Sequence, residues 1–203
     1  AYEILRSDWS SDVCSSDLTL LSYGNAAGWM RFTAADKVWF EARYAPDMVG
    51  DTLVSSFVGV CEVTVVPSGD ITIVDSTGVL DASEDFIGWR TILGNGDYIE
   101  PIYQEGGATL KAVGAGGTAE ATGAGYGGAT AIATFKKWGF KWDGPRSRLT
   151  YYEDGAQVAY INVTSALSFP DLNHMGMIFA AKAHTAAAAT WNLDWWAGGA
   201  TTV

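Results

Sequence analysis

The chain has 203 residues, a net charge of −11 at neutral pH and only 17% charged side chains, which fits a single domain. The acidic balance argues against a nucleic-acid binder, because such a protein needs a basic face to meet phosphates. The low charge content argues against a helical bundle, and the 9 Trp, 9 Tyr and 8 Phe argue against disorder. Together with 24 glycines, this composition indicates many short strands and turns.

The N-terminal segment is rich in Ser and Asp and allows two interpretations, a native linker or a non-native stretch. Residues 6–18 read RSDWSSDVCSSDL and resemble the in-frame translation of a sequencing-library adapter. We therefore predict a non-native stretch over 1–18 and one domain over 19–203. Cys14 falls in that stretch, so we expect Cys61 to be a lone, buried thiol rather than half of a disulfide. No apolar run reaches the ~18 residues of a membrane helix.

In the first half of the domain, alternating apolar and polar residues predict strands. Residues 38–44 read VWFEARY, which predicts a half-buried strand with Trp39, Glu41 and Arg43 on its polar face. A long strand is predicted over 51–66, bent or broken at Gly59. Further strands are predicted at 19–23, 71–74 (within a hairpin over 62–74), 86–92 and 98–103, with a fragment near 108–113 inside a Gly-rich loop over 106–130.

In the second half, turn signals separate further strands. Asp154-Gly155 predicts the tip of a hairpin. Strands are predicted at 131–142, 148–152, 157–163, 175–181 and 191–196, and the Ala-rich stretch 180–190 is predicted to be a loop. Alternation in the last strand places Leu193 and Trp196 on opposite faces. About ten strands and almost no helix predict an all-β fold, an antiparallel β-sandwich of the jelly-roll type with two packed sheets.

Several stretches, in this order, carry a family resemblance: FEAR at 40–43, WGFKWDG at 138–144 leading into LTYYEDGAQVAYI at 149–161, FPD at 169–171, and the closing strand at 191–196. The chain resembles concanavalin A-like or laminin-G-like jelly rolls. More narrowly, it resembles uncharacterised structural proteins of tailed bacteriophages that have this fold. The resemblance implies a two-sheet sandwich and a virion component. Its motifs are fold motifs, and none is a catalytic signature.

The catalytic patterns of this fold are not found in the sequence. Its glycoside hydrolases resemble Glu-x-Asp-x-x-Glu on one strand, which places two carboxylates about 5 Å apart beside the sugar bond. The nearest stretches, Glu84-Asp85 and 97–100, lack that alternating spacing. Polysaccharide lyases of this fold resemble Arg-x-Glu with Gln-Ile-His, whereas 41–43 reverse the first motif and the second is absent. We therefore expect a protein that is not an enzyme.

Metal sites are weakly indicated. His174 and His184 have no partner at metal-ligand spacing, so we expect no zinc and no cofactor. A structural calcium ion stays an alternative, because relatives of this fold often hold one with loop carboxylates. The loop carboxylates that could ligate it belong to Asp70, Asp75, Asp97 and Asp143.

The tryptophans give the strongest functional hint, because the C–H face of a sugar packs on an indole ring. Trp89, Trp142 and Trp196 are our candidates for carbohydrate or partner binding. Trp195 and Trp196 are adjacent, so a regular strand would leave at least one of them exposed or at an interface.

The leading hypothesis is a non-enzymatic phage virion protein, a capsid decoration or fibre-associated domain, located in the virion or otherwise extracellular. Its partners would be other virion proteins or a second copy of itself, with cell-surface glycans as a further class. Neither nucleic acid nor membrane insertion is expected. The alternative is a carbohydrate-binding, lectin-like domain, and a glycoside hydrolase or polysaccharide lyase ranks third.

Overall fold

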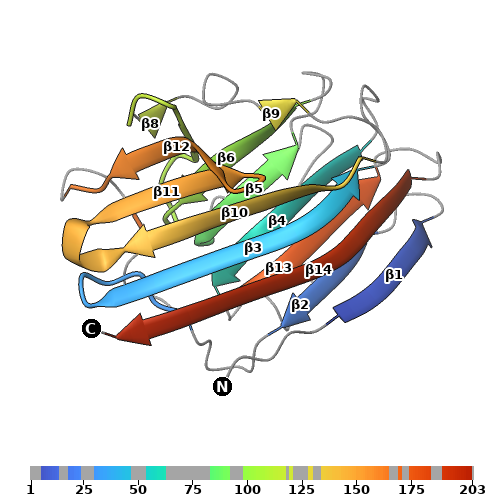
Figure 1. The fold of residues 1–203 in the computed structure, drawn as a ribbon, viewed down its shortest axis with the longest axis horizontal. Helices are drawn as coiled ribbons and strands as arrows, with labels where there is room; N and C mark the ends of the chain where they lie inside the picture. The colour runs from blue at the N-terminus through green and yellow to red at the C-terminus, as the bar shows by residue number, and fades with distance from the viewer. Residues whose placement is uncertain are drawn as a thin grey trace.

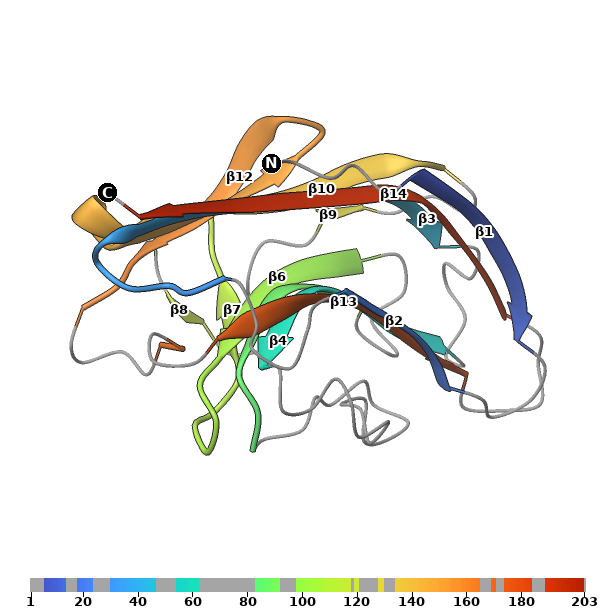
Figure 2. The same cartoon turned by 90° about the horizontal axis from the view of Figure 1, so that it is seen from below.

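The computed structural model describes residues 6–13, 18–23, 30–46, 54–62, 83–91, 98–117, 119–120, 128–129, 134–164, 169–170, 174–183 and 189–202. They form two antiparallel sheets packed face to face (Figures 1 and 2), which confirms the predicted β-sandwich. Helical structure among them is one 3₁₀ turn, η1 (Gly144–Arg146). In this part of the chain, no helix is long and apolar enough to cross a membrane.

The six-stranded sheet faces the viewer in Figure 1 and lies uppermost in Figure 2. Each of its strands is antiparallel to its neighbours. In spatial order it contains β1 (Arg6–Val13), β14 (Ala189–Thr202), β3 (Asp36–Pro46), β10 (Lys136–Asp143), β11 (Arg148–Glu153) and β12 (Ala156–Asn162).

The eight-stranded sheet forms the second layer. In spatial order it contains β2 (Leu18–Tyr23), β13 (Met175–Ala183), β4 (Val54–Glu62), β5 (Phe86–Thr91), β6 (Tyr98–Gln104), β7 (Lys111–Val113) and β8 (Ala119–Glu120), with β9 (Gly128–Ala129) paired to β6. The predicted strand fragment near 108–113 is β7, and β8 and β9 are short strands in the stretch expected to be a loop.

Strand alternation builds the core between the two sheets. On β3, Val38, Phe40, Ala42 and Tyr44 are buried, as the VWFEARY pattern predicted. Aromatic rings dominate the interior, and the Trp89 and Trp138 rings meet there with centroids 4.9 Å apart. Because these apolar side chains leave water, their burial is the main contribution to the stability of the sandwich.

β4 runs through Gly59 without the bend or break that we expected. Gly59 pairs with Gly88 of β5. A Cβ atom added at Gly59 or Gly88 would lie 3.0 or 2.8 Å from Cζ of Phe57. The two glycines therefore let the Phe57 ring cover the strand pair, which is one of the established uses of glycine within a strand.

β14 contains a bulge that the alternating sequence pattern does not reveal. Its register with β3 shifts between Leu193 and Trp195, and Leu193 and Trp196 both join the core. The prediction that these two side chains face opposite ways is therefore wrong, because a bulge inserts one residue and resets the alternation. Trp195 is half-buried, so the half-exposed member of the adjacent tryptophan pair is Trp195.

The N-terminal strand β1 lies at the edge of its sheet, paired with β14. Whether residues 1–18 are native stays a prediction. β13 and β14 extend into 180–190, which we expected to be a loop. The predicted hairpin at 62–74 and residues Asp70, Asp75 and Asp97 lie outside the described residues, apart from Glu62 at the end of β4.

Candidate functional site

A groove of about 200 Å³ lies on the outer face of the six-stranded sheet. It runs over β3 and β10 and reaches the turn between β11 and β12. Side chains at alternate positions of these strands form its walls, because residues two apart point to the same face. Its lining residues are Trp39, Glu41, Lys137, Gly139, Lys141, Tyr152 and Gly155. Phe40 and Phe140 also border it, but their side chains are buried in the core.

Gly139 forms the floor of the groove. It sits between Glu41 on β3 and Tyr152 on β11, which are its register partners, and it contributes no side chain to the space between them. A Cβ atom there would lie 2.6 Å from the carbonyl oxygen of Phe40. From the core side, Nε1 of Trp89 donates a hydrogen bond of 3.1 Å to the Gly139 carbonyl oxygen. The groove is thus fixed by a bond that crosses the sandwich.

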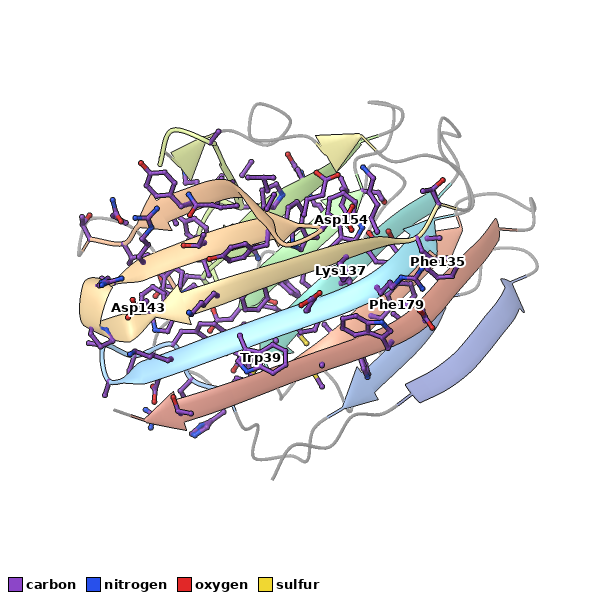
Figure 3. The ribbon with its side chains drawn as sticks, in the orientation of Figure 1. Trp39, Phe135, Lys137, Asp143, Asp154 and Phe179 are labelled. Atoms are coloured by element: carbon purple, nitrogen blue, oxygen red, sulfur yellow. The ribbon has the colours of Figure 1, made fainter. Side chains whose placement is uncertain are left out.

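Trp39 forms one wall and is the most exposed large hydrophobic side chain described, at 39% exposure. Its indole lies against Gly199 of β14, where an added Cβ atom would be 2.5 Å from Trp39 Nε1. Figure 3 shows Trp39 on the viewer-facing side of the sheet, where β3 meets β14. An aromatic ring is therefore held against the sheet surface and left accessible to a ligand.

Polar groups surround this ring. Lys141 is the cross-strand neighbour of Trp39 and is exposed. Further along, Nζ of Lys137 lies 3.4 Å from Oε1 of Glu41, and Tyr152 supplies a phenol. Both hydrogen-bond donors and acceptors thus converge on one aromatic surface.

The β11–β12 turn closes one end of the groove. Asp154 and Gly155 both have positive φ, 49° and 84°, as in a type I′ hairpin turn, which confirms the predicted Asp-Gly tip. The Asp154 carboxylate accepts a hydrogen bond of 2.9 Å from the Lys137 N–H, and the Asp154 N–H donates one of 2.8 Å to the Lys137 carbonyl. These two bonds hold the turn on β10 and place Gly155 at the groove.

The structure places the three predicted binding tryptophans in the interior. Exposure is 0% for Trp89, 3% for Trp142 and 8% for Trp196. Trp89 supports the groove floor from beneath, and Nε1 of Trp142 donates a hydrogen bond of 2.8 Å to the Thr33 carbonyl. Their binding role stays a prediction, but their rings are not on the surface that carries the groove.

Sequence reasoning missed Trp39 as a site residue. The signal was present, because the VWFEARY alternation sets Trp39 on the same face as Glu41 and Arg43. Large aromatic side chains are usually buried, so one on the polar face of a half-buried strand indicates a candidate binding residue.

Phe135 is a second exposed aromatic residue on this face, at 37% exposure. The Arg43 guanidinium lies 4.5 Å from the centre of its ring and also pairs with Asp194 of β14. Figure 3 shows Phe135 and Lys137 near the end of β10 that lies away from Asp143. Phe135 is thus already engaged by a cation, whereas Trp39 has no cation–π partner among the described residues.

On the eight-stranded sheet, Arg90 and Glu100 form a buried ion pair across β5 and β6, with Nε 2.7 Å from Oε1. Asp85 accepts a hydrogen bond of 2.7 Å from the Gly106 N–H. Asp143 pairs with Arg146 at 3.4 Å. Within the described residues, no three His, Cys, Asp or Glu side chains gather in a way that could hold a metal ion.

Cys61 is a free, buried cysteine, as expected. It lies in a small apolar cluster with Phe57, Phe86 and Ile178. Burial raises the pKa of its thiol, with a further contribution from Glu84 and Glu62. A neutral thiol in such surroundings is a packing group and a weak nucleophile.

No protein-family model matches the chain, and no curated protein sequence is detectably similar to it. Solved structures share its fold. The carbohydrate recognition domain of Emp46p aligns with a TM-score of 0.60 at 8% identity, covering 94% of this chain and 87% of that one. An endo-1,3-β-glucanase from Streptomyces sioyaensis aligns at 0.57 and 12% identity, covering 87% and 68%. The endo-β-1,3(4)-glucanase SCLam aligns at 0.54 and 10%, covering 87% of this chain and 60% of its own length.

These neighbours support the jelly-roll sandwich fold of this chain. Among them, one is a carbohydrate recognition domain and two are glucanases. They correct the expectation of a protein without enzymatic activity, because two of them are glucanases. The phage virion role, the virion location and the structural calcium ion are not tested by them and stay predictions.

Proposed function

We propose that this protein binds carbohydrate in the groove on the outer face of its six-stranded sheet, with Trp39 as the stacking surface. The observation that carries the proposal is an exposed indole, supported by Gly199, beside a groove lined by Lys141, Glu41 and Tyr152. A sugar offers a C–H face for the indole and hydroxyl groups for the polar side chains around it.

The size of the groove supports surface binding. Enclosed ligand pockets usually measure about 300–1,000 Å³, and this groove of about 200 Å³ is smaller. It therefore suits contact with one face of a sugar within a longer chain. The Glu41 carboxylate lines it and can accept hydrogen bonds from sugar hydroxyl groups. Binding is thus the role that the groove residues support.

The experiment is a glycan array on the intact chain, followed by calorimetric titration with the glycans that bind. Trp39→Ala should weaken binding about tenfold or more, because stacking contacts are lost from the centre of the site. Phe135→Ala is the matched control, since it also removes an exposed aromatic ring from the same face, outside the groove. Mass spectrometry of the incubated glycan would detect cleavage in the same samples.

Equal weakening by both variants would contradict a site centred on Trp39. Binding unaffected by Trp39→Ala would overturn the proposal and direct attention to the opposite sheet. A folded protein that binds no glycan would overturn it as well.

A further inference from the structure

Three neighbouring strands of the six-stranded sheet, β3, β10 and β11, have a surplus of cations on their outer face in a strongly acidic protein. The outward positions of β3, β10 and β11 carry five cations and two acids, whereas the whole chain has 12 Lys and Arg against 23 Asp and Glu. The cations are those of Lys37, Arg43, Lys137, Lys141 and Arg148, and the acids are Glu41 and Asp143.

Each described acidic group around this face already has a partner. Glu41 pairs with Lys137, and Asp143 pairs with Arg146. Asp194 pairs with Arg43, and Asp154 accepts a backbone N–H.

Lys141, unlike the acidic groups just described, has no charged partner among the described residues. It lines the groove and is directly opposite Trp39 in the β3–β10 register. No cation–π contact joins its ammonium to the indole, although Lys136 and Arg148 make such contacts elsewhere. The Lys141 ammonium is therefore available to bind an anion. Because it does not cover the Trp39 ring, a sugar can stack on that ring at the same time.

We infer that the glycan bound in this groove is acidic, with a carboxylate or sulfate group on the Lys141 ammonium and a sugar ring on Trp39. The inference rests on the proposed function and adds the substrate class. Charge complementarity supports it: the outward acids are paired, so the cation that remains at the groove selects a negative group. The net charge of −11 repels polyanions from the rest of the surface, so that binding of an anionic glycan requires a local site.

The test compares polygalacturonate, dextran sulfate and uncharged dextran by calorimetric titration at low and moderate salt. Lys141→Gln should weaken binding of the anionic polymer about tenfold, as expected on losing one charge-assisted hydrogen bond. It should leave binding of uncharged sugars within twofold. Lys141→Arg should restore binding, because it restores the charge. Lys111→Gln, on β7 of the other sheet, is the matched control and should leave binding unchanged.

The two polymers distinguish the source of the charge, since polygalacturonate carries carboxylates and dextran sulfate carries sulfates. Binding of either one that depends on both Trp39 and Lys141 supports the inference. Equal binding of charged and uncharged sugars, or no effect of Lys141→Gln, would overturn it while the proposed function stands. If glycan binding does not depend on Trp39, the proposed function itself is wrong. Lys141 is exposed, so thermal unfolding should be unchanged in the variants and can verify that they are folded.

Discussion

The indole of Trp39 packs directly against the backbone of Gly199, which belongs to the neighbouring strand β14. Nε1 of Trp39 would lie 2.5 Å from a Cβ atom added at Gly199. The two residues are register partners. Because Gly199 has no side chain, the Trp39 ring can lie against the β14 backbone at that position. The aromatic surface of the groove is therefore fixed by a residue that does not line it.

Gly199→Ala should weaken glycan binding without touching the ligand. The added methyl group overlaps the indole and forces Trp39 to move, so we expect a several-fold rise in the dissociation constant measured by titration. Gly116→Ala is the matched control, because a Cβ there meets nothing within 4 Å. Unchanged affinity in Gly199→Ala would mean that the ring position seen here is not the one used in binding.

The buried ion pair between Arg90 and Glu100 should be far more important for stability than the exposed pair between Lys137 and Glu41. The side chains of Arg90 and Glu100 are 6% and 1% exposed. Glu100→Ala leaves a buried guanidinium without this carboxylate and should lower the free energy of unfolding by about 3–5 kcal/mol. Glu41→Gln should change it by less than about 1 kcal/mol. Urea unfolding of both variants measures the difference, and similar small losses would contradict the burial of the pair.

Tyr103→Phe should stabilise the protein. The Tyr103 hydroxyl is buried and has no hydrogen-bond partner among the described residues, and a buried polar group in that state is destabilising. Removing the hydroxyl should raise the free energy of unfolding by about 1 kcal/mol. Chemical denaturation at neutral pH checks this. If the variant is destabilised instead, the hydroxyl has a hydrogen-bond partner and the prediction is wrong. Tyr151→Phe is the comparison, because it removes a hydroxyl that donates a hydrogen bond of 2.6 Å to the Ile102 carbonyl.

Alkaline pH should destabilise the fold through its buried tyrosines. Burial raises the pKa of Tyr103 to about 12, whereas an unfolded tyrosine titrates near ~10. Between these two pKa values the folded state keeps a proton that the unfolded state has lost. The free energy of unfolding is therefore unaffected by this group below pH ~10 and falls as the pH rises toward 12. Tyr103→Phe should flatten part of this dependence in thermal unfolding from pH 9 to 12. Burial also raises the pKa of Tyr151, with a smaller contribution from Tyr103, so part of the slope should remain.

A variant lacking residues 1–17 should still fold, because β1 is an edge strand whose register is with β14. Its removal leaves β14 at the edge of the sheet, and an exposed edge favours association between copies. We expect one cooperative thermal transition with a modest fall in its midpoint. Light scattering should reveal concentration-dependent self-association. Loss of the cooperative transition would contradict the interpretation of 1–18 as a non-native stretch.

Local patterns in the sequence determined the fold class and most strands. The alternation in 38–44 assigned the buried and exposed faces of β3 correctly, and Asp154-Gly155 located a hairpin turn, because both signals depend on near neighbours along the chain. Tertiary structure decided the rest. The bulge in β14, the unbroken path of β4 through Gly59 and the burial of Trp89, Trp142 and Trp196 depend on which strands pair and which faces meet. The groove depends on three strands whose register places Gly199 opposite Trp39 and Gly139 opposite Glu41, two residues further along β3. Register between distant segments is not encoded in any one of them.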